Sequence, residues 1–435
     1  MTRRQAHLNA MLIGSGYHES AWLVQDHDPV ELASFEHLQR SALTAERGLL
    51  DSIFFADTPN LTLFRAAFFP QIFYDPVVLL AAVGAVTQHI GLFATASTTY
   101  NSPYELARRF LTADHTSGGR VGWNVVTTAD AKAAKNFGVA EHPEHDDRYA
   151  RAGEFVDVVQ RLWHGWEDGA ILGDRRSRRW ADVARIHPAD FHGTYFDVAG
   201  ALPIPPSPQG SPVIAQAGSS PAGVDLAARV ADVVFTPQPT IAAGKSFRST
   251  LEAAARRHGR PVDDIRILPG LAFVLGSTEA EAASTRLELE ESADPELRWR
   301  NVAHNAGMNM TLIDPSRPLS DEAAATAELS TIGKYIVAEA QKSGEPFGEV
   351  ARRMTGLPGG LDFTGTPEQM ADLIEDWVSE GGSDGFTLQP TMLPDSLDLF
   401  VDHVVPLLQK RGLHRTEYEG STLRSHLGLP AGPEE

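Results

Sequence analysis

The chain has 435 residues, a formal net charge of -20 and no cysteine. The negative charge disfavours nucleic acids and anionic membranes as partners, and the lack of cysteine excludes disulfides, thiol nucleophiles and thiolate metal ligands. The hydrophobic fraction of 42% is typical of a soluble globular protein. Residues 77–86, the longest apolar run, are too few to cross a bilayer, and no secretory signal is recognisable, so we expect a cytoplasmic protein.

Short β-rich runs alternate with longer amphipathic patterns, as in a parallel sheet built from βα units. Strands are expected at residues 8–13, 52–56, 90–95, 121–126, 213–217, 232–235, 267–276 and 385–389. Helices are expected at residues 31–47, 76–87, 103–115, 148–163, 222–229, 247–258 and 367–380. Eight strands in this arrangement favour the α/β class and a (β/α)8 TIM barrel, which with insertions spans residues 1–435 as a single domain.

Two segments exceed what a minimal barrel requires. Residues 165–209 follow the fourth strand and residues 277–360 follow the seventh, whereas residues 410–435 form a C-terminal tail. Long insertions in compact domains are usually lids or binding loops. We expect the second insertion to be a lid, with Gly356, Gly359 and Gly360 as hinge positions. The arginine cluster at residues 175–179 is interpreted as a solvated loop.

The catalytic face of a TIM barrel lies at the carboxyl ends of its strands. Here the residues after the predicted strands are mainly hydroxyls, amides and glycines, with Asn124, Thr127 and Thr128 ending one buried run. Such a ring suits a polar cofactor better than acid–base hydrolysis. The sequence also lacks a nucleophile elbow, a Walker A motif and a Rossmann fingerprint after a strand, which argues against hydrolases and nucleotide kinases.

The stretch "QAGSSPAG" places Ser219, Ser220 and Pro221 between a predicted strand and a predicted helix. A helix N-terminus with free amides and two hydroxyls suits a phosphate group. The alternative is that Ser220 only caps the helix. The position at the carboxyl end of a barrel strand favours phosphate binding.

The stretch "EHPEHDDRY" brings His142 and His145 close to four acidic residues, but the spacing of the histidines is not a recognised zinc signature, and we predict no metal. We expect a helix N-cap at Asp146 or Asp147, with His145 and Tyr149 facing a cofactor from adjacent turns. The isolated His18 and His304 are compatible with polar packing as well as with proton transfer.

Several long motifs, in one order along nearly the whole chain, resemble the oxygenating component of the nitrilotriacetate monooxygenase family in the bacterial luciferase-like superfamily. They are "ATASTTYNSPYELARRF", "DHTSGGRVGWNVVTTADAKAAKNFG", "EHPEHDDRYARAGEF", "PVIAQAGSSPAG", "ADVVFTPQ", "DGFTLQP" and "VVPLLQKRGLHRTEYEGSTLRSHLGLP". The resemblance implies a TIM barrel that uses reduced FMN and dioxygen, through a flavin peroxide, to oxygenate a small organic substrate. It further implies a separate NAD(P)H:flavin reductase, which supplies FMNH2, and a homodimer or homotetramer.

The resemblance also implies roles for individual residues. Asn124 would line the flavin and oxygen pocket, and Asp57, Thr95 and Thr98 would approach the isoalloxazine ring. The ribityl-phosphate region would be reached by the pair His145 and Tyr149, and the phosphate would be held by Ser219 and Ser220. His18 and His304 are hypotheses for a proton donor.

The aromatic residues Phe54, Phe55, Phe64, Phe68, Phe69, Phe73 and Tyr74 favour an apolar or heteroaromatic substrate over a polyanion, although some of them must belong to the core. Family members commonly have His-His and Arg-His-Pro after the first strand, whereas this chain has Tyr17-His18 and Gln25-Asp26-His27. Two other functions stay open. One is an F420-dependent oxidoreductase of the same superfamily, and the other is a non-catalytic flavin-binding protein.

Overall fold

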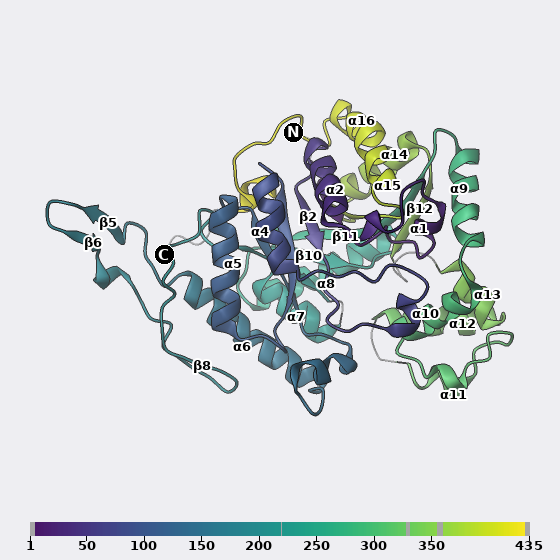
Figure 1. Cartoon of the computed structure of the whole chain (residues 1–435), viewed down its shortest axis with the longest axis horizontal. Coiled ribbons are helices and arrows are strands. Elements are labelled where there is room, and N and C mark those ends of the chain that lie inside the picture. The colour runs from purple at the N-terminus through teal and green to yellow at the C-terminus, as the bar shows by residue number, and fades with distance from the viewer. Residues whose placement is uncertain (1–4, 219, 328–330, 355–359, 431–435) are drawn as a thin grey trace.

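Eight parallel strands form a closed barrel in the computed structural model, which describes residues 5–218, 220–327, 331–354 and 360–430 (Figure 1). The strands are β1 (His7–Met11), β2 (Ser52–Phe55), β3 (Gly91–Ser97), β4 (Val121–Val126), β9 (Val213–Ala217), β10 (Val233–Thr236), β11 (Arg266–Leu275) and β13 (Gly385–Pro390). They pair in the order β10-β9-β4-β3-β2-β1-β13-β11, and β10 pairs with β11 to close the ring. The predicted (β/α)8 barrel is confirmed.

The pleat of the strands decides which side chains enter the barrel. Leu92 of β3 packs in the core between strands and helices, whereas the adjacent Phe93 packs in a separate cluster inside the barrel. Successive side chains of a strand alternate between its two faces, so Thr95 also points inward. In β4, Trp123 belongs to the outer core, and its neighbour Asn124 therefore points inward. The pattern brings polar side chains into the carboxyl-terminal mouth of the barrel.

Helices cover the outside of the barrel. The longer ones are α2 (Phe35–Arg47), α4 (Pro76–Val86), α5 (Pro103–Ser117), α6 (His145–Trp163), α7 (Pro221–Val230), α8 (Ile241–Arg257) and α14 (Pro367–Ser379), each where a helix was predicted. Shorter segments are α1 (Ala21–Val24), α3 (Leu63–Ala66), α15 (Asp395–Leu399), α16 (Val405–Lys410), α17 (Leu423–His426), the 3-10 turns η1 (Glu31–Ala33), η2 (Ala131–Phe137) and η4 (Val262–Asp264), and the π turn η6 (Phe400–Val404).

Proline at the first position and a capping side chain fix several helix starts. Asp75 accepts hydrogen bonds from two amides at the start of α4, and Thr366 forms a reciprocal capping box with Gln369 in α14. The predicted N-cap at Asp146 or Asp147 was wrong. The cap of α6 is Glu144, and both aspartates lie in the first turn. Their negative charge interacts favourably with the positive end of the helix dipole.

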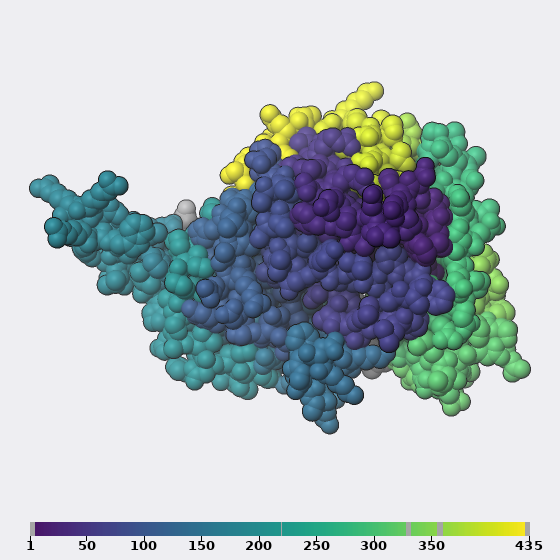
Figure 2. Space-filling view, in the orientation of Figure 1, coloured from purple at the N-terminus to yellow at the C-terminus, as the bar shows by residue number. Residues whose placement is uncertain are grey.

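The first insertion forms two antiparallel hairpins, of which the second packs against α6 and the barrel core (Figure 1). They are formed by β5 (Ile171–Asp174) with β6 (Arg179–Ala181), and by β7 (Phe191–His192) with β8 (Asp197–Val198). The 3-10 turn η3 (Val183–Arg185) follows β6. Figure 2 shows the β5–β6 hairpin projecting far from the barrel.

The second insertion is helical and has its own small core. It comprises α9 (Glu279–Glu291), α10 (Pro295–Asn305), η5 (Met310–Leu312), α11 (Asp321–Ala324), α12 (Thr331–Ser343) and α13 (Phe347–Arg353). Trp299, Ile336 and Phe347 belong to a cluster separate from the barrel core. A further strand, β12 (Leu361–Gly365), continues the sheet by pairing with β11, and the sequence patterns did not indicate it. Of the proposed hinge glycines, Gly356 and Gly359 lie outside the described residues.

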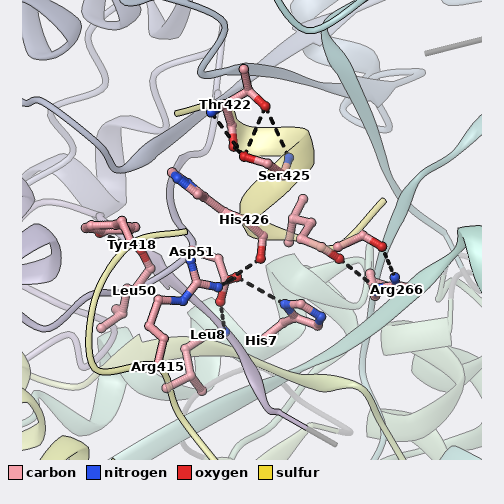
Figure 3. A network of polar contacts seen from close by, with 12 residues as sticks. His7, Leu8, Leu50, Asp51, Arg266, Arg415, Tyr418, Thr422, Ser425 and His426 are labelled. Carbon is pink, nitrogen blue, oxygen red and sulfur yellow. Dashed lines mark hydrogen bonds and ion pairs between the residues drawn. The ribbon is translucent and has the colours of Figure 1, made fainter. Parts of the chain in front are cut away.

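The C-terminal tail closes the amino-terminal end of the barrel. Leu423 and Leu427 pack in the cluster inside the barrel. Figure 3 shows Asp51 receiving hydrogen bonds from His7, the backbone of Leu8 and Arg415 of the tail. Burial alone would raise the pKa of Asp51, but Arg415 and His7 hold it below its usual range. The tail is therefore fixed to the barrel by a buried ion pair as well as by apolar packing.

No described helix has the length and apolarity needed to cross a membrane.

Candidate functional site

The mouth of the barrel contains a buried amide that is only half satisfied. Asn124 Nδ2 donates to Thr95 Oγ1 over 2.9 Å, since β4 and β3 pair with these two residues in register. Asn124 Oδ1 is buried and has no hydrogen-bond partner among the described residues. Because an unpaired buried acceptor is costly, this oxygen favours a ligand or an ordered water at this place.

Across the mouth, β13 contributes a second inward amide. Neither polar atom of the Gln389 side chain has a partner of good geometry among the described residues, although the amide lies near enough to Tyr17 to influence its pKa. Burial raises the Tyr17 pKa well above its usual value, so the phenol stays protonated. A Cβ on Gly270 would lie 3.1 Å from Gln389 Oε1, so the absence of a side chain there leaves room for the amide.

Asp57 follows β2 at the rim of the mouth. Burial, together with the nearby carboxylate of Asp75, raises the pKa of Asp57 to about 6. Asp57 lines two hollows of about 40 and 420 Å³, and the smaller one is also lined by Thr95. Thr98 directly follows β3 and donates to the carbonyl of Val126 over 3.2 Å. Asp57 follows β2, Thr95 lies within the adjacent β3 and Thr98 follows β3, so all three belong to one side of the mouth.

The larger hollow has a mixed lining, in which Phe73, Leu61 and Phe137 lie beside polar side chains such as Asp57 and Asp75. The Phe137 ring stacks on Tyr100 with centroids 4.5 Å apart, and the Tyr100 hydroxyl shares a 2.7 Å hydrogen bond with His142 Nδ1. These contacts give His142 a structural partner. No group of three or more His, Cys, Asp or Glu within the described ranges is arranged to hold a metal ion.

The junction between β9 and α7 has the shape that its sequence suggested. Ser220 Oγ accepts a hydrogen bond from the Gly223 amide over 3.1 Å and so caps α7. A Cβ on Gly223 would lie 3.1 Å from the Gly218 Cα, so only glycines allow the strand end and the helix start to approach this closely. As an acceptor in the cap, the Ser220 hydroxyl keeps its hydrogen free to donate. Ser219 lies outside the described residues.

His145 and Tyr149 occupy adjacent turns at the start of α6, with ring centroids 4.8 Å apart. His145 is 49% exposed and its Nδ1 lies 2.8 Å from Asp146 Oδ1. α6 packs against α7, whose first turn carries the Ser220 cap. The side-chain hydrogen bonds between these two helices join Arg229 of α7 to Gly153 and Asp157 of α6, and no described contact joins His145 or Tyr149 to Ser220.

His18 lies under the second insertion. It is 3% exposed, and burial together with the charges of Arg298 and Arg286 lowers its pKa to about 3. Arg298 of α10 lies 3.3 Å from His18 Nε2 and forms a 3.0 Å ion pair with Glu19. His18 is therefore uncharged at neutral pH and lies at the contact between the insertion and the barrel.

His304 lies at the other end of α10. It is half-buried and meets Phe64 of α3 edge to face, with centroids 5.8 Å apart. Burial, with the charges of Arg65 and Lys132, lowers its pKa. The structure does not bring His304 and His18 into contact.

Sequence reasoning missed two features of the site. Asn9 of β1 and Thr387 of β13 share a 3.4 Å hydrogen bond inside the barrel, and the alternation of polar and apolar residues in "HLNAM" could have indicated it. The pairing of Glu19 with Arg298 joins residues that are 279 positions apart and left no local signal. Among the aromatic candidates, Phe55 belongs to the outer core and does not line the mouth.

The closed barrel of parallel strands with a polar carboxyl-terminal mouth places the chain among the TIM-barrel proteins, and comparison with known proteins shows its family. Residues 13–384 match the family described as luciferase-like monooxygenase. The chain belongs to this family.

Three relatives align over nearly the full length. Nitrilotriacetate monooxygenase component A of Aminobacter aminovorans is 40% identical over 98% of this chain and 97% of its own length. N-acetyl-S-(2-succino)cysteine monooxygenase of Bacillus subtilis is 37% identical with the same coverage. Dibenzothiophene-sulfone monooxygenase of Rhodococcus erythropolis strain XP is 38% identical over 98% of this chain and 97% of its own. All three relatives are named as monooxygenases, as is the matching family, so this chain is an enzyme of the monooxygenase type.

Solved structures of similar proteins share this fold over nearly the whole chain. EDTA monooxygenase from Chelativorans sp. BNC1 superposes with a TM-score of 0.80 at 36% identity, covering 99% of this chain and all of that one. A riboflavin lyase crystallised with modified FMN and riboflavin superposes with a TM-score of 0.83 at 30% identity, covering 98% and 96%. An F420-dependent reductase from Methanopyrus kandleri, at 16% identity, shares the fold alone.

Proposed function

We propose that this chain is the oxygenase component of a two-component system, which binds reduced FMN at the mouth of the barrel and oxygenates a small organic substrate with dioxygen. The observation that carries the proposal is the unpaired Asn124 Oδ1 at the bottom of the mouth, on the same carboxyl-terminal face as the capped start of α7. The polar edge of a flavin ring can form a hydrogen bond with Asn124 Oδ1. The phosphate of FMN suits the helix N-terminus at the start of α7.

The donor set fits FMN. Asn124 and Thr95 would face the polar edge of the ring, with Asp57 and Thr98 beside them. The free hydroxyl hydrogen of Ser220 and the amides of the first turn of α7 would hold the phosphate, together with Ser219, and His145 and Tyr149 would border the ribityl chain. When bound, reduced FMN supplies the electrons that activate dioxygen, which no amino-acid side chain of this chain can do.

The protein's own tasks are orientation, exclusion of water and proton transfer. The Asn124 amide is held by Thr95 and needs no reorganisation when a ligand arrives. The helical insertion 277–360 would act as the lid, with the Arg298–Glu19 pair as its contact to the barrel. His304, which is only half-buried, is the candidate proton donor, whereas His18 holds the lid contact because its ring is uncharged and enclosed.

For the substrate, Phe73, Leu61 and Phe137 in the hollow beside Asp57 would pack against an apolar or aromatic part, whereas the polar side chains of the same hollow would face polar atoms. A flavin reductase would deliver FMNH2 either by contact or by diffusion. The F420 alternative has weaker support, because the F420-dependent neighbours share only the fold.

Anaerobic titration with FMNH2, followed by mixing with oxygenated buffer, tests the proposal. We expect saturable binding of FMNH2, and slower reoxidation of bound than of free flavin because the mouth excludes water. Nitrilotriacetate, N-acetyl-S-(2-succino)cysteine and dibenzothiophene sulfone would then be offered with a flavin reductase and NADH, and products gaining one oxygen atom sought by mass spectrometry. Failure to bind FMNH2, with binding of reduced F420 instead, would overturn the proposal.

A further inference from the structure

Arg65 of α3 carries a positive charge that its surroundings leave without a counter-ion. The guanidinium lies over the Phe69 ring, 4.9 Å from the centroid, and its Nε is buried without a hydrogen-bond partner. Among the residues that the structure describes, no carboxylate or carbonyl oxygen accepts a hydrogen bond from this side chain. Because arginine stays protonated in proteins, the charge persists at a cost in free energy.

The carboxylates around Arg65 already have other partners. Glu19 is the group whose negative charge acts on Arg65, but its two oxygens accept hydrogen bonds from Arg298 and Asn301. Asp130 lies on the side of α10, and both of its oxygens accept from neutral donors. The folded chain therefore offers Arg65 electrostatic neighbours but no direct acceptor within the described residues.

The position of α3 sets Arg65 between the larger hollow and the second insertion. α3 belongs to the connection from β2 to α4, which lines the hollow before α3, at Leu61, and after it, at Phe73. On its other side α3 packs against α10, where Phe64 meets the His304 ring. Burial, followed by the charge of Arg65, lowers the pKa of His304. Arg65 thus lies at the edge of the proposed substrate site.

The unpaired charge is separate from the proposed phosphate site. The capped start of α7 follows β9, whereas α3 follows β2, and both β4 and β3 stand between these two strands in the barrel. An anion at Arg65 is therefore a second anion. The planar guanidinium presents two parallel N–H groups, which match the two oxygens of a carboxylate.

We propose that Arg65 binds a carboxylate of the substrate, so that this enzyme oxygenates a small organic acid whose apolar part packs against Leu61 and Phe73. The inference rests on the proposed function, because it names the class of substrate for that reaction. It assigns to Arg65 the choice between organic acids and neutral compounds.

The first test is binding to the flavin-free protein, which does not depend on turnover. Succinate, benzoate and nitrilotriacetate at about 10 mM, compared with sodium chloride of equal ionic strength, should raise the melting temperature, since a ligand of the folded state stabilises it. The neutral analogues succinamide and benzamide should not. Arg65→Leu should abolish the shift, and Arg65→Lys should keep part of it, because lysine retains the charge but not the planar fork.

The same variant separates binding from a structural role. Without ligand, Arg65→Leu should melt at the wild-type temperature or above it, because an unpaired charge is replaced by an apolar side chain. A lower melting temperature would show that the fold itself uses the charge, and would overturn the inference.

The second test is turnover with a flavin reductase and NADH. Of the compounds offered above, nitrilotriacetate and N-acetyl-S-(2-succino)cysteine carry carboxylates, and dibenzothiophene sulfone does not. For an oxygenated carboxylate, Arg65→Leu should raise KM by at least about tenfold and change kcat by less than about twofold, while the affinity for FMNH2 stays the same. The matched control is Arg300→Leu, which removes an exposed, ion-paired arginine from α10 and should change none of these values.

The outcomes distinguish this inference from the proposed function. Normal FMNH2 binding with equal carboxylate binding by the wild type and Arg65→Leu overturns the inference alone, and so does a wild type that oxygenates only the neutral sulfone. Loss of FMNH2 affinity in Arg65→Leu would assign Arg65 to the flavin and overturn it as well. A wild type that binds no FMNH2 would overturn the proposed function and, with it, the inference.

Discussion

Asn124 donates its amide hydrogen to Thr95 Oγ1 over 2.9 Å, while Oδ1 of the same amide is buried without a partner among the described residues. An unpaired buried acceptor lowers the stability of the free protein, and a ligand that donates a hydrogen bond to the oxygen removes this cost. Substitution of Asn124 is therefore expected to change the stability of the free protein and its affinity for the ligand differently, and each of these two quantities can be measured by itself.

Asn124→Leu should leave the free protein as stable as the wild type to within about 1 kcal/mol, because the substitution removes an unsatisfied polar atom and keeps the branched shape of the side chain. Affinity for FMNH2 should fall by about tenfold or more, the equivalent of one hydrogen bond. Thermal unfolding of the free protein and anaerobic flavin titration give the two values. A variant that loses stability but binds FMNH2 normally would show that the amide serves packing alone.

Ser220→Asp and Ser220→Asn form a matched pair, since both residues can still cap α7. The aspartate adds negative charge where the phosphate is proposed to lie, so FMN affinity should fall by about a hundredfold while riboflavin affinity changes little. Asparagine should lower FMN affinity less. Equal losses for FMN and riboflavin in the aspartate variant would place the phosphate elsewhere.

The raised pKa of Asp57 predicts a dependence of stability on pH. The folded protein holds the Asp57 proton more tightly than the unfolded chain, so the contribution is complete below the carboxyl's ordinary pKa near 4 and is lost as the pH rises through about 6. Asp57→Asn should therefore narrow the difference in melting temperature between pH 4.5 and pH 7.5. Asp75→Asn keeps a capping side chain and should lower the Asp57 pKa, which a pH titration of the melting temperature would detect.

Glu19→Gln should loosen the contact between the insertion and the barrel, because Arg298 would keep a buried charge without its carboxylate. Removing one member of a buried pair costs about 3 kcal/mol or more. Amide exchange in α10 should accelerate, and more hydrogen peroxide should form per NADH consumed as water enters the mouth. The control is Glu296→Gln, which removes an exposed ion pair with Arg300 on the same helix and should change neither value.

Asp51→Asn should destabilise the fold by about 3 kcal/mol or more at neutral pH, because Arg415 and His7 would lose their buried carboxylate. The lowered pKa of Asp51 means that its contribution is present above the ordinary carboxyl pKa and is lost as the pH falls below about 4. The difference between variant and wild type in chemical denaturation should therefore shrink in acid. Asp398→Asn, at an exposed ion pair, should have little effect at any pH.

Most of the strands and helices of the barrel could be predicted from local sequence patterns. The strand and helix predictions held because buried parallel strands read as short apolar runs and the helices keep an amphipathic period. The capping of α7 was visible in the order Ser220, Pro221, Ala222. The cap of α6 was misplaced by two residues or more because several acidic residues compete there. β12 escaped notice because exposed polar residues interrupt its apolar ones, so that it does not read as a buried strand.

The sequence by itself determined the barrel, its insertions and the polar character of the mouth, because hydrophobic period, turn residues and helix caps act over a few neighbouring positions. Only the tertiary structure decided which polar atoms are left unpaired, that Glu19 meets Arg298, and that the arginine-rich hairpin projects freely. These relationships join residues far apart in the chain, and their energies depend on burial and distance, which the linear sequence does not contain.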